Sequence, residues 1–179
     1  MALIMSTLER ATHICLIAVS VLALGLLLEG RFGTRRPGGG RAAATQLVGK
    51  HLAVAGLDWK SSAVNVVFFI STHCHFCEES MPFYRQVTEI PGRAPQKLAI
   101  SAISRDDPEL VKGTLSKQHV NLDGVYRAPV IDALSSTPIV LIVDANGIVR
   151  RVFEGRLDSS REKDVLKIVA SGILGRIRT

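Results

Sequence analysis

The middle of the chain alternates between strand-like and helix-like spacings of apolar residues. Residues 62–70 form an apolar run that is typical of a buried strand. Residues 78–87 follow it closely and carry the mixed spacing of a helix. The pattern repeats with a strand at residues 97–103 and a helix at residues 107–119. This second helix opens with an Asp-Pro pair, suited to an N-cap and a first helical position.

The C-terminal part of the chain predicts a β-hairpin and a final helix. Residues 138–144 and 148–153 are strand-like and flank Asn146-Gly147, a pair typical of a tight hairpin turn. Ser159 or Ser160 is expected to cap the last helix. The order of elements predicts an α/β sandwich, with helices flanking a sheet that mixes parallel and antiparallel strands. The apolar face of the last helix is expected to comprise Val165, Leu166, Ile168, Val169 and Ile173.

An apolar segment near the N-terminus has about the length of a membrane span. Residues 14–28 contain no Asp, Glu, Lys or Arg, and a bilayer span needs about 17–25 residues. We expect an uncleaved signal anchor at residues 11–29, preceded by a flank at residues 1–10. A cleaved signal peptide is the alternative, but the run ends without a small-x-small cleavage site. Cys15 is interpreted as a small apolar residue of this segment.

The amino-acid composition predicts a linker after the apolar segment and gives no indication of nucleic-acid binding. Residues 30–45 are rich in Gly, Arg and Ala, which predicts a flexible linker to a folded domain at residues 46–179. Residues 1–45 hold five Arg and two Glu, whereas residues 46–179 hold 17 Lys or Arg and 14 Asp or Glu, so each part carries +3. The domain is therefore only mildly basic, and no basic stripe with interleaved aromatic residues suggests nucleic acid.

The sequence Cys74-His75-Phe76-Cys77 lies where the first strand passes into the first helix. Two cysteines with two residues between them, at such a junction, indicate a reversible dithiol/disulfide centre. The free N–H groups and partial positive charge of a helix N-terminus stabilise a thiolate on the first cysteine. Cys74 is therefore expected to be the attacking thiol, and Cys77 to be buried and to act as the resolving thiol.

The residues around the two cysteines are expected to tune this centre. A cationic His75 beside the helix N-terminus would lower the thiol pKa and make the disulfide more oxidising. His73 has a similar but less direct role, and Phe76 would form an apolar rim against substrate. The alternative is that these side chains are ordinary surface or packing residues. Glu78 and Glu79 are interpreted as solvated acids of the first helical turn.

At this point residues 46–175 resemble the thioredoxin fold. The resemblance is carried by the CxxC at a strand–helix junction and by Thr137-Pro138 leading into a hairpin and a terminal helix. The inserted strand–helix unit at residues 97–119 resembles membrane-anchored thiol–disulfide oxidoreductases of the TlpA/ResA type. The resemblance implies a cis peptide bond at Pro138, facing the disulfide, and an exposed backbone at Thr137 that pairs with a substrate strand.

The chain departs from the family pattern at three positions. His73 stands where the family usually has Trp, and Phe68 stands where thioredoxins place a buried carboxylate. Ser80 replaces a Glu that is frequent in the TlpA/ResA group, although the following Pro82 does match. A buried proton acceptor for Cys77 is therefore not where the family would supply it.

The sequence predicts a thiol–disulfide oxidoreductase that exchanges a Cys74–Cys77 disulfide with protein substrates. Protein thiols and disulfides, a redox partner that recycles the CxxC and a lipid bilayer around residues 11–29 are the expected partners. No cofactor and no bound metal are expected. The direction of electron flow is left open, because His75 favours an oxidant and the resemblance favours a reductant.

Two other functions remain open at the level of sequence. A peroxiredoxin-like peroxidase would have Pro in place of Val67, although Ser71 matches the pattern of that class. A copper- or zinc-binding module would use Cys74, Cys77 and the two neighbouring histidines, His73 and His75. Structural zinc usually needs a second ligand pair, and none is visible in the sequence. Peroxide turnover, metal stoichiometry and thiol exchange distinguish these readings.

The expected location is the bacterial inner membrane, as a single-pass protein whose domain faces the periplasm. The CxxC chemistry and the resemblance both favour this orientation. Arg31, Arg35, Arg36 and Arg41 follow the apolar segment and favour the opposite one, because positive charge tends to stay in the cytoplasm.

Overall fold

The computed structural model describes residues 41–91 and 96–172, together with Ile17 and Ser20. The chain divides into two compact units, Met1–Gly38 and Gly39–Thr179, and the helices and strands discussed below belong to the second. The expected flank at residues 1–10, and the expected span at residues 11–29 except for Ile17 and Ser20, lie outside the described residues. Within the described part, no helix is long and apolar enough to cross a membrane.

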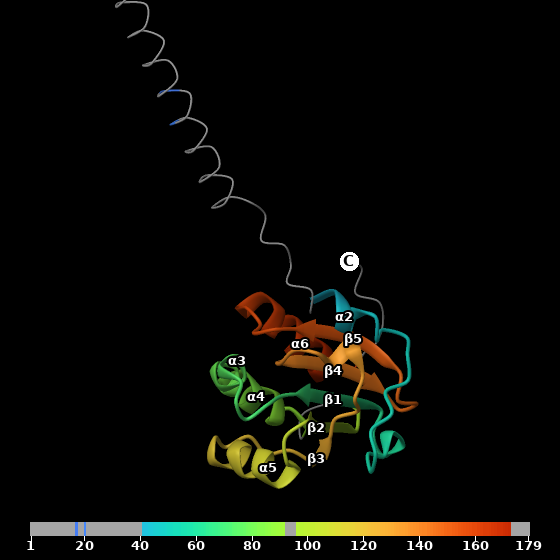
Figure 1. The fold of residues 1–179 in the computed structure, drawn as a ribbon. Coiled ribbons are helices and arrows are strands. Elements are labelled where there is room, and N and C mark those ends of the chain that lie inside the picture. Colours follow the sequence, from blue (N-terminus) through green and yellow to red (C-terminus); the bar gives the residue numbers. More distant parts are fainter. Residues whose placement is uncertain (1–16, 18–19, 21–40, 92–95, 173–179) are drawn as a thin grey trace, which may run out of the picture. The chain divides into compact units, whose positions relative to one another are not determined.

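A mixed sheet of five strands forms the centre of the domain (Figure 1). Its order is β3-β2-β1-β4-β5, with β1 parallel to β2, β2 parallel to β3, and both β4 and β5 antiparallel to their neighbours. The expected mixed α/β sandwich is therefore confirmed. The strands are β1 (Val64–Phe69), β2 (Leu98–Ser104), β3 (Gly124–Arg127), β4 (Ile139–Asp144) and β5 (Val149–Glu154).

Strand β1 lies in the middle of the sheet, and all six of its residues are buried. Its side chains alternate between two cores, as the two-residue period of a strand requires. Val66 and Phe68 face one core, whereas Val67 and Phe69 face the other. Burial on both faces explains why this strand appears in the sequence as a continuous apolar run rather than an alternating one.

The two faces of the sheet are covered in different ways. Side chains of α4, α5 and α6 complete the first core, and the segments around α2, η1 and η3 complete the second. Figure 1 shows α3 and α4 on the same side of the sheet as α5. The helices are α2 (Arg41–Thr45), α3 (His75–Glu79), α4 (Met81–Thr88), α5 (Pro108–Lys117) and α6 (Ser159–Ser171), with short 3₁₀ turns η1 (Trp59–Ser61) and η3 (Asp132–Leu134).

The helix after the CxxC is divided in two, whereas the sequence pattern predicts one helix at residues 78–87. Ser80 ends α3 and precedes α4. Pro82 lies in the first turn of α4, and a proline has no N–H to donate to the carbonyl four residues earlier. The carbonyl of Glu78 therefore loses its regular helical partner, and Ser80 donates its own N–H to the carbonyls of Cys77 and Glu78 instead.

Two further differences separate the fold from the sequence prediction. The edge strand β3 is not predicted, because its four half-buried or exposed residues show no strand pattern. The cap of α6 is Asp158, whose carboxylate accepts two backbone N–H groups, and neither Ser159 nor Ser160 serves as the cap. The helix α2 contributes the fully buried Ala44 to the core.

The predicted cap of α5 is confirmed. Asp107 Oδ1 accepts the backbone N–H groups of Glu109 at 2.9 Å and Leu110 at 3.3 Å, and Pro108 is the first helical residue. Two of the helix's otherwise unpaired N-terminal donors are satisfied in this way. This helix covers β2 and β3, so its first turn helps to hold the edge of the sheet.

Replacing Asp107 with Ala is expected to lower the free energy of unfolding by about 1 kcal/mol, because the capping hydrogen bonds are lost. Urea denaturation followed by circular dichroism measures the change. Asp164→Ala is the matched control, since Asp164 is exposed in the interior of α6 and Ala favours helix there. Equal losses in the two variants would contradict the capping role.

Candidate redox site

Cys74 and Cys77 form a disulfide at the start of α3, with their Cα atoms 5.2 Å apart. Cys74 is the N-cap of this helix, and its sulfur accepts the backbone N–H of Cys77 at 3.1 Å. Cys77 is 1% exposed, whereas Cys74 is only partly buried. The predicted burial of Cys77 is confirmed, and the two sulfurs differ in access as an attacking and a resolving thiol must.

The core cluster that contains Cys77 includes an aromatic pair. Phe68 is fully buried and its ring centroid lies 4.4 Å from that of Tyr84, and both belong to the core cluster that contains Cys77. Burial raises the pKa of the Tyr84 hydroxyl well above its ordinary value, while a contact from the Ser80 side chain opposes the shift. Tyr84 therefore stays neutral at physiological pH. An uncharged aromatic pair occupies the region where the family resemblance would place a carboxylate.

The loop before Cys74 is held by a carboxylate that the sequence analysis missed. Asp106 Oδ2 accepts hydrogen bonds from the Ser71 hydroxyl (2.9 Å), the Thr72 N–H (2.7 Å) and the Thr72 hydroxyl (2.9 Å). The Thr72 N–H makes the largest contribution to a lowered Asp106 pKa, burial opposes it, and the two hydroxyls and His73 add to the lowering. Asp106 is therefore ionised at neutral pH.

A signal for Asp106 was present in the sequence. Asp106 lies just beyond the carboxyl end of β2, and Ser71 and Thr72 lie just beyond the carboxyl end of β1. Parallel neighbouring strands bring their carboxyl ends to the same edge of a sheet, which is where α/β folds commonly carry their sites. Two parallel strands followed by polar residues therefore predict such a contact.

The hydrogen bonds of Asp106 also orient His73. An ionised carboxylate only accepts hydrogen bonds, so the Thr72 hydroxyl donates its single proton to Asp106. The Thr72 oxygen then accepts from His73 Nδ1, which lies 3.1 Å away. We assign a proton to His73 Nδ1 from this network. The His73 side chain itself is exposed.

His75 and Phe76 lie at the surface of α3 next to Cys74. His75 Nε2 is 3.2 Å from Glu79 Oε1, and the His75 side chain is 74% exposed. Phe76 is 55% exposed, with its ring 5.9 Å from that of His75. Glu79 is also bonded to Arg156 at 3.0 Å, so it is not simply a solvated acid of the helix.

The Thr137-Pro138 peptide bond is cis, which confirms the conformation expected from the resemblance. Antiparallel pairing of β1 with β4 puts Phe69 opposite Ile139, so Pro138 lies beside the end of β1, where the loop to Cys74 begins. The Pro138 carbonyl accepts the N–H of Gly155 at 2.8 Å. Residues far apart in the sequence thus meet at the edge that carries the cysteines.

No group of three or more His, Cys, Asp or Glu side chains in the described part of the chain is arranged to hold a metal ion. The four candidate ligands of the metal-binding alternative are divided between a disulfide and two histidines with other partners. His73 contacts Thr72, and His75 contacts Glu79. His51 and His119 are exposed residues away from the CxxC in sequence.

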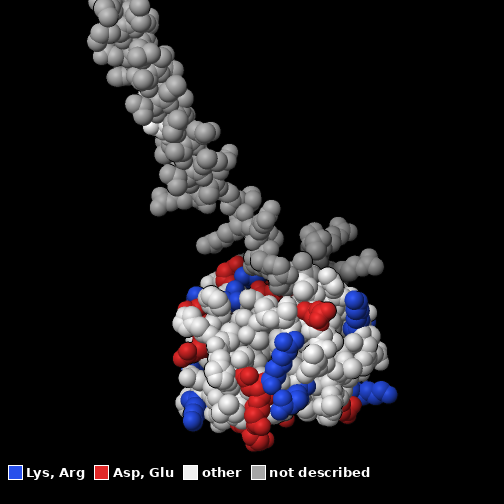
Figure 2. Space-filling model, viewed as in Figure 1, with Lys and Arg blue, Asp and Glu red and all other residues white. Residues whose placement is uncertain are grey.

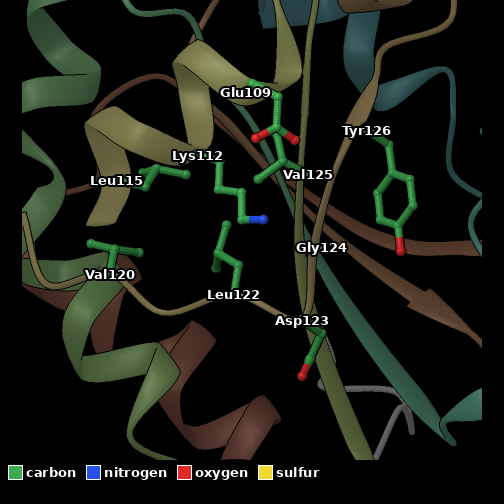
Figure 3. A pocket seen from close by; sticks show the side chains of 9 residues that line it. All are labelled: Glu109, Lys112, Leu115, Val120, Leu122, Asp123, Gly124, Val125 and Tyr126. Carbon is green, nitrogen blue, oxygen red and sulfur yellow. The ribbon is translucent and has the colours of Figure 1, made fainter. Parts of the chain in front are cut away.

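A pocket of about 350 Å³ lies between α5 and the edge strand β3 (Figure 3). Leu115, Val120 and Leu122 give it an apolar lining, and the charged side chains of Glu109 and Lys112 lie among them. None of the predicted redox-site residues lines this pocket. It is therefore a feature of the sheet edge, separate from the CxxC.

The surface charge of the domain is mixed. Figure 2 shows Lys and Arg side chains interspersed with Asp and Glu on the face in view. This distribution matches the small net charge of residues 46–179. No field of a single sign dominates the face in view, in contrast to the basic footprint of a nucleic-acid-binding surface.

Replacing Asp106 with Asn is expected to lower the free energy of unfolding at pH 7 by about 1 kcal/mol, through weaker hydrogen bonds to the loop. Since folding lowers the Asp106 pKa, its contribution is complete above the ordinary carboxyl value of 3.8 and disappears as the pH falls through the lower folded-state pKa. Urea titrations between pH 7 and pH 3 should show the wild type and the variant converging. Asp132→Asn, at an exposed carboxylate, is the control, and a difference independent of pH would contradict the assignment.

Solved structures of other proteins are similar to this domain. A thiol:disulfide interchange protein from Bacteroides sp. superposes with a TM-score of 0.50 at 16% identity, covering 68% of this chain and 90% of that protein. A thiol:disulfide interchange protein of the thioredoxin family from Chlorobium tepidum superposes with a TM-score of 0.47 at 23% identity, covering 65% of this chain and 83% of that protein. A secreted disulfide oxidoreductase from Mycobacterium tuberculosis superposes with a TM-score of 0.47 at 18% identity, covering 70% of this chain and 97% of that protein. No protein-family model and no curated protein matches the chain. The first likeness shows that the chain has a thioredoxin-like fold.

Proposed function

We propose that this protein is a thiol–disulfide oxidoreductase that exchanges its Cys74–Cys77 disulfide with protein substrates. The observation that carries the proposal is a disulfide at the start of a helix, between a partly buried Cys74 and a buried Cys77, with a cis-proline at the same edge of the sheet. The thioredoxin-like fold is compatible with this activity. Neither metal nor cofactor is needed for the chemistry, since the two sulfurs carry both electrons.

The reducing direction begins with the Cys74 thiolate. It attacks one sulfur of a substrate disulfide, forms a mixed disulfide and expels the other substrate sulfur as a thiolate, which takes up a proton. Cys77 then loses its proton and attacks the Cys74 sulfur. This closes the Cys74–Cys77 disulfide and releases the second substrate thiol. Two electrons and two protons pass from the dithiol to the substrate, and the oxidising direction is the reverse.

The surroundings of the cysteines support separate roles for the two thiols. The Cys77 N–H, which points at the Cys74 sulfur, would stabilise a thiolate there, because a hydrogen bond to a charged group is stronger than one to a neutral group. Thr137 would offer its backbone to an extended substrate segment. His73 and Phe76 are exposed and would border that segment.

We also propose that residues 11–29 anchor the protein in the bacterial inner membrane, with the domain in the periplasm. The length of the apolar segment supports the anchor. A disulfide that must remain oxidised or be cycled supports an exported domain, since the cytosol keeps thiols reduced. A second redox protein, in the membrane or dissolved beside it, would recycle the CxxC.

Replacing Cys74 with Ser is expected to abolish thiol exchange, because no attacking thiolate remains. Replacing Cys77 with Ser is expected to leave the first step intact and to trap mixed disulfides with substrates, because the resolving thiol is absent. Non-reducing gel electrophoresis with and without reductant detects the trapped species. Full activity in Cys74→Ser, together with no trapped species in Cys77→Ser, would contradict the mechanism.

A redox titration gives the direction of electron flow. The full chain is equilibrated in dithiol buffers of stepped potential, and free Cys74 and Cys77 are counted by alkylation. A two-electron transition near about −270 mV would indicate a reductant, and one near about −120 mV would indicate an oxidant. Failure to form a reversible disulfide would reject the proposed activity.

The anchor is tested by fractionating cells that express either the full chain or residues 30–179. The full chain is expected in the alkali-washed membrane fraction, and the truncated chain in the supernatant, because residues 11–29 supply the apolar span. Protease added to spheroplasts is expected to digest the domain. Protection of the domain in spheroplasts would instead support the cytoplasmic orientation that the flanking arginines favour.

A further inference from the structure

Beside the CxxC, three charged or titratable side chains form a chain of contacts at the surface. Glu79 Oε1 lies 3.2 Å from His75 Nε2, and Glu79 Oε2 lies 3.0 Å from Arg156 Nη1. His75 and Glu79 are four residues apart on one face of α3, whereas Arg156 comes from the turn between β5 and α6. One carboxylate thus bridges the residue next to Cys74 and a distant loop.

Hydrogen bonds fix the loop that carries Arg156. Arg161 of α6 donates to the backbone carbonyl of Arg156 at 3.0 Å and to that of Glu154 at 3.3 Å. The intervening Gly155 donates its N–H to the carbonyl of Pro138 at 2.8 Å. Arg156 therefore belongs to the same loop that contacts the cis-proline. Because this loop is fixed by hydrogen bonds, Arg156 holds the Glu79 side chain in a defined position.

The bridge bears directly on the redox balance. The reduced form of the centre carries a thiolate on Cys74, and a neighbouring positive charge stabilises that form and makes the disulfide more oxidising. His75, which adjoins Cys74, can supply such a charge. A carboxylate beside His75 offsets part of this effect, because its negative charge opposes the positive charge next to the thiolate.

We infer that Glu79 is a positioning residue that offsets part of the positive charge of His75 and thereby keeps the Cys74–Cys77 disulfide more reducing than the CxxC sequence alone would make it. This inference rests on the proposed oxidoreductase function and deepens it. It opposes the oxidising influence that the sequence assigns to His75. Arg156 contributes by holding the carboxylate in place.

The test is a comparison of redox equilibria with glutathione at about pH 6, where a histidine side chain carries much of a positive charge. The full chain is used, and alkylation measures the fraction of Cys74–Cys77 disulfide. Glu79→Gln is expected to shift the equilibrium constant about threefold toward the dithiol, which is about 15 mV for a two-electron couple. This size follows from the modest strength of exposed ion pairs.

The decisive readout is the dependence on His75. In a His75→Ala background, Glu79→Gln is expected to cause less than half of its original shift, because the charge that it offsets is gone. Glu78→Gln is the matched control, since it removes the same charge from the adjacent exposed residue. Its shift is expected to be the same with and without His75. Circular dichroism checks that all variants are folded.

The outcomes separate this inference from the proposed function. A reversible disulfide whose Glu79→Gln shift is absent, or is equal in the two His75 backgrounds, would overturn the role of Glu79 and leave the oxidoreductase function intact. A wild-type chain that forms no reversible disulfide would overturn both. A Glu79-specific shift toward the dithiol that depends on His75 would establish the role.

Discussion

Burial of β1 on both faces of the sheet is the constraint on which the rest of the structure depends. A strand with Val66 and Phe68 in one core, and Val67 and Phe69 in the other, has to lie inside the sheet with paired neighbours on both sides. One neighbour is parallel and one is antiparallel, so the end of β1 meets the end of β2 and the beginning of β4. The CxxC, Asp106 and the cis-proline are gathered at this edge by strand direction alone.

The site assembled at this edge is stabilised by polar contacts on one side of Cys74 and by aromatic packing on the other. Asp106 accepts three hydrogen bonds from the loop that enters the site, and a charged acceptor makes such bonds stronger. Phe68 and Tyr84 pack against each other in the core cluster that contains Cys77, and neither carries a charge at neutral pH. The position where the family resemblance places a carboxylate, which would accept a proton from Cys77, is therefore occupied by the uncharged Phe68.

The inferred redox tuning depends on charged side chains at the surface. The Glu79 bridge between His75 and Arg156 links the residue adjoining Cys74 to the turn that contacts Pro138. Exposed pairs are individually weak, but a redox potential responds to small differences between two protonation or charge states. A substrate that covers this surface would exclude water and strengthen the same interactions.

The sequence by itself determined the order of most elements, the redox cysteines and the cap at Asp107, because each depends on residues close together in the chain. It did not predict β3, whose short half-buried segment becomes a strand only by pairing with β2, or the break at Ser80, where the effect of Pro82 on a carbonyl outweighs helical spacing. Asp106 and Arg156 were also missed. Asp106 lies 34 positions after its partner Thr72 in the sequence, and Arg156 reaches Glu79 from another loop. Only the tertiary structure decided these contacts, since the strand pairings set them and local sequence does not.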